Sequence, residues 1–571
     1  MRPRNIVFTS RHAVAIAAGL MLAASFPKIS IAGFAWIAPA ILLGVGSGLT
    51  SGAIFRLGYL GGVACYLAQL YWLLLIPVSG LETAAAVAGW IALAAYLALY
   101  PAFWAWLCWQ SFPNAISTTD EYSAASDQSA FVRVASLIEL LSPMRRFLWP
   151  VQCAAYWVAL EMLVGRLFSG FPWDFLGVSQ YRMLPITQIA SFTGVYGVSF
   201  LVIWFSVSLL VCAGLLLRTP SRSWRWRAPL LPPLVAVCVV AVWGMGEINH
   251  RPQPSGRELK VALVQPSIPQ TLIWNTNENS ARFDQLIKLS QDAVNSQHPD
   301  VVIWPEAAVP NMLRHDPEVA SKIQKFVLTN KVWMVVGSDD AVLDKNSTEV
   351  PEYIFYNSSF LISPRGMIEA SYRKRQLVIF GEYIPFVRAL PFLQWFVPGS
   401  SGNGFTSGER AVPFKIPLLG ANMSVLICFE DTFPHLAPEY VTDDTDFLLN
   451  LTNNGWFGES AAQWQHAATA VFRAIENRVP LVRCANNGLT CWVDDVGRMH
   501  EIYFHNSSNV YQVGYKAVRI PLLGKGEKRG QTFYNRHGDL FGWACVLVAV
   551  VQLGRFAWGK TAPKKAETPA D

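Results

Sequence analysis

The sequence predicts a chain in two parts, a multi-span α-helical membrane domain of about eight helices and an α/β domain outside the membrane. Of its 571 residues, 52% are apolar and only 15% are charged, whereas soluble chains carry roughly 25% charged residues. The apolar residues gather before about residue 250 and again near the end, and the part between has an ordinary α/β pattern. We therefore expect an N-terminal transmembrane domain of seven helices over 1–250, a catalytic domain over 258–525 and a C-terminal transmembrane helix over 536–560.

Eight apolar runs carry the membrane prediction. A bilayer needs about 20 apolar residues in a helix, and several runs reach that length while the first two are shorter. The runs cover residues 12–26, 33–48, 57–79, 84–111, 147–167, 190–217, 229–247 and 538–558. The first run follows Arg2, Arg4 and Arg11 and also resembles a cleavable signal peptide. Because the second run follows almost at once, a membrane hairpin is the favoured interpretation.

The positions of Lys and Arg near the run ends predict the orientation, since basic residues favour the cytoplasmic side. The short loops on the opposite side hold only Lys28, Arg166 and Arg182. The cytoplasmic segments would hold Arg2, Arg4, Arg11, Arg56, Arg133, Arg145, Arg146, Arg218, Arg222, Arg225, Arg227, Arg555, Lys560, Lys564 and Lys565. Seven spans then place residues 258–525 on the far side of the membrane, which in a bacterium is the periplasmic side of the inner (cytoplasmic) membrane.

Two segments between the apolar runs are irregular. Residues 113–130 are rich in Ser, Thr, Asp and Ala, which predicts a flexible cytoplasmic loop. Residues 169–180 are aromatic and interrupted by Gly and Pro, on the same side as the large domain. Such a loop is either an interfacial anchor or one wall of a lipid entrance, and the sequence leaves both open.

The region from 258 onward alternates strand and helix patterns, which indicates an α/β layered domain. Strand patterns open at Leu259, cover 301–304 and cover 332–337. Charged, helix-forming segments separate them at about 279–296 and 317–328.

Three chemically active residues stand at the ends of apolar strand patterns. Cys428 ends Val-Leu-Ile-Cys, Glu306 follows Val-Val-Ile-Trp-Pro, and Lys374 precedes Leu-Val-Ile-Phe. A lone buried cysteine is usually inert packing, but a carboxylate can take its proton and an ammonium is expected to lower the pKa of the thiol. Together the three residues predict an acyl-transfer site. Taken singly, Glu306 is also compatible with a solvated loop and Lys374 with a basic surface patch.

Four further residues have weaker signals. Glu382 and Glu430 are ordinary charges or groups that orient Lys374 and an incoming amine. Cys484 and Cys491 lack a basic setting and are expected as core thiols, or as a disulfide in an oxidising compartment.

Several longer motifs carry a family resemblance. They are Val-Gln-Pro-Ser-Ile-Pro-Gln-Thr-Leu-Ile-Trp (264–274), Trp-Pro-Glu-Ala-Ala (304–308), Phe-Gly-Glu-Tyr-Ile-Pro (380–385), Thr-Asn-Asn-Gly-Trp-Phe-Gly (452–458), the segment 465–477, Asn-Asn-Gly-Leu-Thr (486–490) and Gly-Phe-Pro-Trp (170–173). With the Glu, Lys and Cys above, the chain resembles the apolipoprotein N-acyltransferases, the membrane-embedded branch of the nitrilase superfamily. The resemblance covers nearly the whole chain and implies a nitrilase-like (CN hydrolase) α-β-β-α sandwich.

The resemblance implies a ping-pong reaction that completes bacterial lipoprotein maturation. A fatty acyl chain would pass from a phospholipid to Cys428 as a thioester, and then to the N-terminal amine of a diacylglyceryl-cysteine apolipoprotein. Glu306 would be the general base and Lys374 the oxyanion stabiliser, together with the backbone N–H of Phe429. Glu382 and Glu430 would support the site.

Substrate contacts are implied at two places. Trp274 ends its motif, and Phe429 follows the nucleophile where well-known members carry a tyrosine, so a hydroxyl contact is missing. The segment 384–399 is rich in large apolar residues and Pro, which predicts a mobile arm entering lipid through Phe392, Trp395 and Phe396. Core packing is the alternative for the arm. The loop at 112–146 is also longer than the family pattern requires, and the sequence offers no explanation for it.

Other functions are less favoured by the residues. A membrane-tethered amidase or nitrilase would use the same triad with water as acceptor. A transporter would need more ionisable groups in the spans than Arg56 and Glu161, and a non-catalytic scaffold would not need three catalytic residue types. The net charge of +6 lies largely beside apolar runs, so no nucleic-acid partner is expected. We expect a monomer with no cofactor and no metal site.

Overall fold

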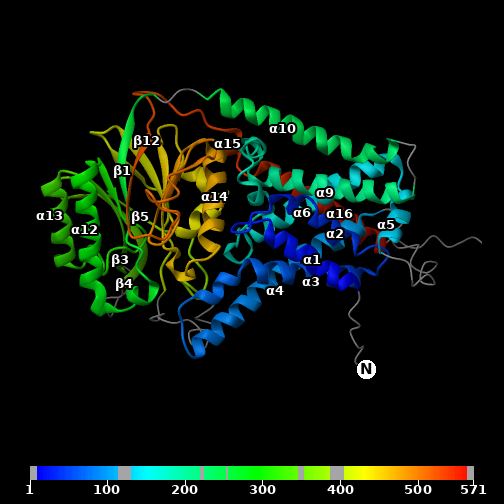
Figure 1. The fold of residues 1–571 in the computed structure, drawn as a ribbon, viewed down its shortest axis with the longest axis horizontal. Helices are drawn as coiled ribbons and strands as arrows, with labels where there is room; N and C mark the ends of the chain where they lie inside the picture. Colours follow the sequence, from blue (N-terminus) through cyan, green and yellow to red (C-terminus); the bar gives the residue numbers. More distant parts are fainter. Residues whose placement is uncertain are drawn as a thin grey trace, which may run out of the picture.

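The computed structural model describes residues 10–112, 130–218, 224–251, 255–344, 353–385 and 404–561. The loop predicted at 113–130 therefore lies outside the described residues except for its last position, and so do the arm residues Phe392, Trp395 and Phe396. The helices before residue 250 and the C-terminal helix pack together, and two β-sheets lie beside them at one end (Figure 1).

Each of the eight apolar runs contains a helix. These helices are α1 (Ser10–Ala24), α2 (Ala38–Gly44), α3 (Ser51–Gln69), α4 (Leu81–Gln110), α6 (Pro143–Val164), α9 (Val195–Arg218), α10 (Leu231–Asn249) and α16 (Leu540–Thr561). Within the described part of the chain, five helical stretches are long and apolar enough to cross a membrane, at Leu81–Gln110, Pro143–Val164, Val195–Leu217, Trp226–Asn249 and Leu540–Trp558. The protein is thus a membrane protein by these helices, and the total of eight spans stays a prediction.

Shorter helical elements connect these helices. They are η1 (Ala32–Trp36), η2 (Tyr71–Leu75), α5 (Ala130–Glu139), η4 (Leu167–Ser169), η5 (Leu176–Gln180), α7 (Leu184–Thr187), α8 (Ala190–Thr193) and η6 (Trp224–Leu230). Helix α5 was not expected. It buries Val134 and Ile138 in the cluster of apolar side chains that also contains Leu210 of α9, so part of the long loop at 112–146 is packed structure.

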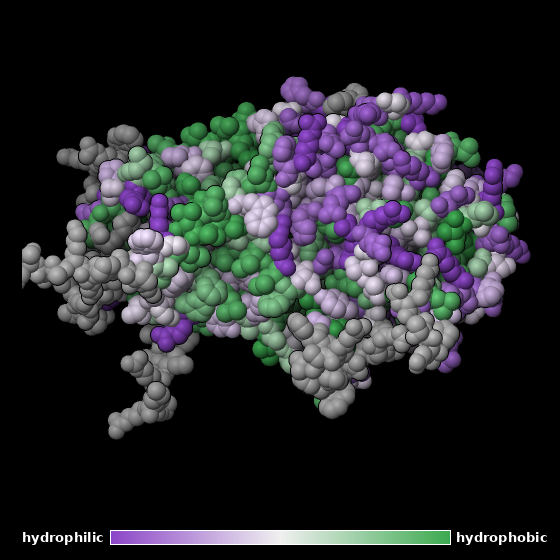
Figure 2. Space-filling model, turned by 180° about the vertical axis from the view of Figure 1, so that it is seen from behind, coloured by the Kyte–Doolittle hydropathy of each residue, from purple (hydrophilic) through white to green (hydrophobic). Residues whose placement is uncertain are grey.

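Small residues let the membrane helices approach closely. Gly58 and Gly62 lie on α3 with the small-xxx-small spacing that favours helix contact in lipid. A Cβ at Gly62 would lie 2.8 Å from Ala98 Cα of α4, and a Cβ at Gly58 would lie 2.9 Å from Ala102 Cα. The outer faces carry exposed apolar residues, such as Val239 of α10, which is 60% exposed. Figure 2 shows this apolar surface over the helical part and a more hydrophilic surface over the sheets.

The α/β domain contains two six-stranded sheets. The first has the order β12-β1-β2-β3-β4-β5 and the second has the order β11-β10-β9-β8-β7-β6. The strands are β1 (Glu258–Gln265), β2 (Val301–Ile303), β3 (Trp333–Leu343), β4 (Tyr353–Ile362), β5 (Ile368–Arg373), β6 (Pro413–Ile416), β7 (Ala421–Ile427), β8 (Phe447–Thr452), β9 (Leu481–Ala485), β10 (Cys491–Val493), β11 (Met499–His500) and β12 (Gly514–Pro521). Strands β1, β2 and β3 run parallel, as do β7, β8 and β9.

Helices cover both outer faces of the sheet pair (Figure 1). The helical elements of this domain are α11 (Gln270–Ile273), η7 (Thr276–Glu278), α12 (Asn279–Gln297), α13 (Pro317–Asn330), η9 (Cys428–Thr432), η10 (Ala437–Tyr440), η11 (Asn454–Phe457), α14 (Ala462–Asn477) and α15 (Phe533–His537). Helices α12 and α13 cover the first sheet, and α14 lies between the second sheet and the membrane helices. This is the expected α-β-β-α sandwich.

The alternation of side chains along strand β1 explains the layering, because successive residues of a strand point to opposite faces. Val261 and Leu263 join the core between the sheets. Ala262 and Val264 instead join the core under α12 and α13. Both faces are therefore apolar, as in a sheet covered on both sides. In α14 every residue except Trp464 is buried, since that helix has a sheet on one face and membrane helices on the other.

Candidate active site

The cysteine at position 428 stands at the end of β7, in the turn to η9. Its φ is +53°, a left-handed conformation that costs a non-glycine residue about 1–3 kcal/mol and recurs at active sites. Two side chains hold the turn through the carbonyl oxygen of Cys428: Asn450 Nδ2 donates to it at 2.9 Å, and His466 Nε2 lies 3.2 Å away. The strain is thus stabilised by groups of β8 and α14.

The carboxylate of Glu306 lies in the loop after β2, at the carboxyl edge of the parallel strands. Its Oε2 accepts a hydrogen bond of 2.8 Å from the backbone N–H of Asn453, which directly follows β8 of the other sheet. Its Oε1 accepts from Asn357 Nδ2 at 2.9 Å. The loop passes so close to β3 that a Cβ at Gly337 would lie 2.2 Å from the carbonyl oxygen of Pro305. Both sheets therefore fix the position of this carboxylate.

The ammonium of Lys374 joins two of the predicted carboxylates. Its Nζ lies 2.9 Å from Glu382 Oε1 and 3.3 Å from Glu306 Oε1, and its side chain is 1% exposed. Burial opposes the charge of Lys374, but the carboxylates of Glu382 and Glu306 outweigh burial and raise the pKa of Lys374 well above its usual value. The lysine is therefore a permanent buried cation and not part of a surface patch.

The electrostatic surroundings of the cysteine differ from the expectation. Burial, followed by the negative charge of Glu306, raises the pKa of the Cys428 thiol to about 12, although Lys374 and the hydroxyl of Thr452 act in the opposite direction. Lys374 lowers this pKa, as expected, but desolvation and the carboxylate of Glu306 outweigh the ammonium. The resting thiol is neutral, and it needs a base to become a nucleophile.

The carboxylate of Glu430 is engaged with the backbone. Its Oε2 accepts from the N–H of Ile427 at 2.6 Å, and its Oε1 accepts from the N–H of Arg375 at 2.7 Å and of Gln376 at 3.1 Å. Tyr372 also donates its hydroxyl to it. Glu430 therefore ties the nucleophile turn to the segment that carries Lys374, which is a positioning role.

The structure adds residues that the sequence did not single out. Asn357 of β4 donates to Glu306 and also to Glu382 Oε1 at 2.9 Å. Asp339 stands opposite it on β3. Burial, then the charges of Glu306 and Glu382, raise the pKa of Asp339 to about 7. In the sequence, Asn357 and Asp339 are marked only as polar residues at inward positions of apolar strands.

A second buried network lies behind the nucleophile. His466 Nε2 lies 2.6 Å from Asp431 Oδ1, and Arg483 bonds the other oxygen of that carboxylate. His466 and Asp431 both occur close to matched motifs, but nothing in the sequence pairs them.

The ring of Phe429 belongs to an aromatic cluster that reaches the loop at 169–180. It stacks on Trp173 with ring centroids 6.1 Å apart, contacts Phe171 at 5.9 Å and meets Phe433 edge-on at 5.0 Å. Trp173 of this loop is 7% exposed and lies beside the residue that follows Cys428, so the loop packs against the site. Its role as an interfacial anchor or as one wall of a lipid entrance stays a prediction.

The amide of Gln465, on α14, joins the catalytic domain to the membrane helices. Its Oε1 accepts from Trp72 Nε1 and from Trp173 Nε1, both at 2.9 Å. Its Nε2 donates to the carbonyl oxygens of Pro27 at 3.0 Å and Gln69 at 3.3 Å. One side chain thus fixes three membrane segments against the active-site domain.

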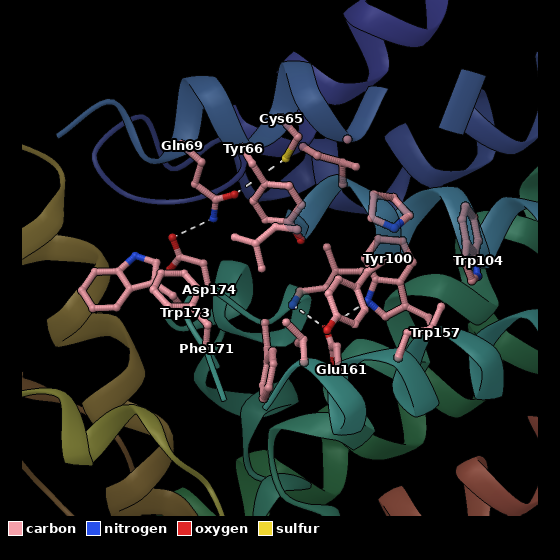
Figure 3. Close-up of a pocket in the computed structure, with 18 of the residues that line it drawn as sticks. Cys65, Tyr66, Gln69, Tyr100, Trp104, Trp157, Glu161, Phe171, Trp173 and Asp174 are labelled. Atoms are coloured by element: carbon pink, nitrogen blue, oxygen red, sulfur yellow. Dashed lines mark hydrogen bonds between the residues drawn. The ribbon is translucent and has the colours of Figure 1, made fainter. Parts of the chain in front are cut away.

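A narrow cavity lies on the membrane side of Trp173, among α3, α4 and α6 (Figure 3). Asp174 accepts from Gln69 at 2.7 Å, and Glu161 accepts from the backbone N–H of Leu176 at 2.8 Å. The volume of about 60 Å³ has room for a few water molecules at roughly 30 Å³ each. In this conformation it is too small for a fatty acyl chain.

The remaining predicted residues take peripheral places. Trp274 is 45% exposed and meets Trp456 edge-on at 5.4 Å, so its ring is available for a substrate contact. Cys484 and Cys491 are free thiols buried in the core, so they are core thiols and do not form the alternative disulfide. Within the described ranges no group of three or more His, Cys, Asp or Glu is arranged to hold a metal.

Comparison with known proteins identifies the family. Residues 18–208 match the model of the apolipoprotein N-acyltransferase N-terminal domain, and residues 260–514 match that of the carbon-nitrogen hydrolases. The chain is 34% identical over 543 residues to the apolipoprotein N-acyltransferase of Geobacter metallireducens, covering 95% of this chain and 94% of that protein. The chain belongs to the apolipoprotein N-acyltransferase family.

Other relatives agree with this family. The apolipoprotein N-acyltransferase of Vibrio vulnificus is 29% identical and covers 96% of this chain and 98% of its own length. An amidase of the nitrilase superfamily from Nesterenkonia has a TM-score of 0.33 at 15% identity, covering 48% of this chain and 94% of its own. The whole-length matches to apolipoprotein N-acyltransferases favour neither the amidase nor the scaffold alternative.

Proposed function

We propose that this protein transfers a fatty acyl chain from a phospholipid to the N-terminal amine of diacylglyceryl-cysteine in apolipoproteins, through a thioester on Cys428. The observation that carries the proposal is the convergence of Cys428, Glu306 and the buried Lys374 in a domain packed on membrane helices, in a chain of this family. Such a site has a nucleophile, a base and a fixed cation, and lipid reaches it from the membrane.

The first half-reaction forms the thioester. Glu306 takes the proton of the Cys428 thiol as Sγ attacks the ester carbonyl of the phospholipid, because the neutral thiol is a weak nucleophile. Lys374 supplies fixed positive charge for the oxyanion of the tetrahedral intermediate. The intermediate collapses, Glu306 returns the proton to the leaving alkoxide, and a lysophospholipid departs.

The second half-reaction releases the acyl chain. The neutral α-amine of the diacylglyceryl-cysteine attacks the thioester carbonyl, and Glu306 accepts the proton that the amine loses. Cys428 leaves as a thiolate and takes that proton, which restores the resting enzyme. Glu382 and Asn357 keep Lys374 and Glu306 in place through both steps.

The placement in the membrane is part of the proposal. Residues 1–250 and 536–560 would be the membrane domain, with the N-terminus in the cytoplasm, and residues 258–525 would lie in the periplasm beside the inner membrane. The Lys and Arg distribution supports this orientation. We further propose a monomer in which Trp274, Phe429, Phe392, Trp395 and Phe396 contact the lipid substrates.

A two-substrate assay tests the transfer. Purified protein in detergent receives a phospholipid with an isotope-labelled acyl chain and a synthetic diacylglyceryl peptide, and the products are separated by mass. We expect a labelled, N-acylated peptide and an equal amount of lysophospholipid, with neither product from Cys428→Ala. Free fatty acid as the only labelled product would instead establish a hydrolase.

A further inference from the structure

A second, polar cavity lies where the catalytic domain meets the end of α6. It has a volume of about 510 Å³, which is within the 300–1,000 Å³ typical of small-molecule sites. Its walls include Arg166 and Ser169 just beyond α6, Arg375 and Tyr383 from the active-site domain, and His435 after the nucleophile turn. Unlike the narrow cavity of Figure 3, it is lined by two arginines, although Leu377 and Phe405 also line it.

The cavity stands at the boundary of the membrane helices. Arg166 follows α6 by two residues and forms an ion pair with Asp539, which precedes α16 by one. The Arg166 guanidinium also lies 5.3 Å from the ring centroid of Trp543. Tryptophan and arginine at the ends of spanning helices mark the depth of lipid headgroups, so the cavity is at the depth at which a phospholipid carries its phosphate.

Two buried nitrogen atoms in the walls have no hydrogen-bond partner among the described residues. Arg375 Nη2 bonds Glu439 Oε2 at 2.7 Å, but the buried Nη1 of Arg375 bonds nothing. The buried Nδ1 of His435 is also without a partner. A buried polar group without a hydrogen bond is unfavourable by about 1–3 kcal/mol, so these groups favour a ligand with acceptor oxygens.

The cavity adjoins the catalytic cluster along the chain. Lys374 bonds Glu306 and Glu382, and the next residue, Arg375, lines the cavity. Likewise Glu382 bonds Lys374, and the next residue, Tyr383, lines the cavity and bonds Ser169 at 2.7 Å. In a glycerophospholipid six bonds separate the ester carbonyl carbon from phosphorus, a span of about 7 Å at roughly 1.2 Å per bond.

We propose that this cavity binds the phosphate of the glycerophospholipid acyl donor, with the Arg375 guanidinium and the His435 ring as its main donors. The inference rests on the proposed function and names how the donor is held. Arginine suits this role, since its planar fork matches phosphate oxygens. Arg166 adds positive charge from the membrane side, and Tyr383 and Ser169 supply hydroxyl groups. The phosphate would hold the headgroup while an ester enters the site of Cys428.

The ion pair between Arg375 and Glu439 offers a second variant whose expected effect on donor preference is opposite to that of Arg375→Gln. Glu439 is 52% exposed and takes one of the guanidinium nitrogens. Replacing it by glutamine removes a negative charge beside the proposed phosphate, so Glu439→Gln is expected to favour phospholipid. Arg375→Gln removes the positive charge and is expected to disfavour it.

The experiment compares two donors in the same detergent micelles, a phosphatidylglycerol and the diacylglycerol with the same acyl chains. The readout is the ratio of kcat/KM values for formation of the acyl-enzyme, followed by intact mass. We expect Arg375→Gln to lower the ratio of phospholipid to diacylglycerol about tenfold or more, as for loss of a charge-assisted hydrogen bond, and Arg375→Lys to lower it less. Glu439→Gln should raise the ratio. Arg519→Gln, which changes an arginine that is 68% exposed at the far edge of the first sheet, is the matched control and should leave it unchanged.

The outcomes separate this inference from the proposed function. A wild-type protein that forms no acyl-enzyme with either donor overturns both. If the wild type, Arg375→Gln and Glu439→Gln are all acylated with the same ratio of phospholipid to diacylglycerol, the phosphate site is excluded but the proposed function is not. Glycerophosphate at millimolar concentration then distinguishes the source of the phosphate. If glycerophosphate inhibits acylation of the wild type and Arg375→Gln weakens that inhibition, the cavity also binds free phosphate esters. If glycerophosphate does not inhibit but the variants change the donor ratio, the cavity binds only phosphate that a lipid carries.

Discussion

Lys374 Nζ lies 3.3 Å from Glu306 Oε1, and both side chains are at least nine-tenths buried. The pair joins the end of β5 to the loop that follows β2, and Glu306 in turn accepts from the backbone N–H of Asn453, just after β8 of the second sheet. A cation buried this deeply needs its anions, and the anions need the cation. The proposed base and the proposed oxyanion stabiliser therefore depend on each other for their positions.

We predict that Glu306→Gln abolishes the formation of acyl-enzyme while the protein stays folded. A general base typically contributes 10²- to 10⁴-fold to rate, and the amide keeps nearly the same shape. The measurement is the rate at which the acyl adduct appears on the protein with phospholipid. The control is Glu258→Gln, an exposed carboxylate on β1. Acylation of Glu306→Gln at the wild-type rate would exclude Glu306 as the base.

Lys374→Met is expected to destabilise the protein as well as inactivate it. It leaves Glu306 and Glu382 buried without their cation, a change that typically costs about 3–5 kcal/mol. The measurement is the apparent Tm in detergent, compared with that of Lys415→Met, which removes an exposed ion pair with Asp444. Equal Tm values for the two variants would contradict the buried cation.

The alkylation of Cys428 gives a pH test. Because burial and Glu306 raise the pKa of the thiol to about 12, iodoacetamide should react slowly at pH 7 and faster as pH rises. Glu306→Gln removes a negative charge, so it should lower this pKa and move the profile to lower pH. Lys374→Met should move it to higher pH. The rate is followed by intact mass, and Cys428→Ala corrects for the other thiols. A profile that neither variant shifts would contradict this electrostatic account.

Asp339 predicts a pH dependence of stability. Its pKa is raised from an ordinary 3.8 to about 7 in the folded state, so the folded protein binds more protons than the unfolded chain between these values. The contribution of this group therefore decreases as pH rises from about 4 to 7. We expect the apparent Tm of Asp339→Asn to fall less than that of wild type between pH 5 and pH 8. Asp443→Asn, an exposed carboxylate, should behave like wild type.

Gln465→Leu should loosen the loop at 169–180. The variant removes four hydrogen bonds and leaves the indole N–H groups of Trp72 and Trp173 buried without acceptors. Faster hydrogen exchange in residues 170–176 is expected, together with a lower apparent Tm. Gln291→Leu on α12, whose amide bonds only Asn295 and Asn330, is the control. Unchanged exchange in this loop would show that other contacts hold it.

The sequence was sufficient for the long membrane helices and for the first strands of the α/β domain, but not for helix α5. Apolar runs located the helices, and strand ends located Cys428, Glu306 and Lys374, because catalytic groups follow buried strands whose patterns are local. The raised pKa of Cys428 was not accessible, since it depends on burial and on a carboxylate 122 positions away along the chain. Asn357 and Gln465 were missed for the same reason, as their partners belong to distant segments that only the folded chain brings together.

The most direct test of the central claim is the intact mass of the purified protein after incubation with phospholipid alone. The account predicts an increase by one fatty acyl group, removed by neutral hydroxylamine, absent in Cys428→Ala, and discharged when a diacylglyceryl peptide is added. A folded protein that acquires no acyl group from any phospholipid, or that carries it on Cys428→Ala as well, would contradict the account.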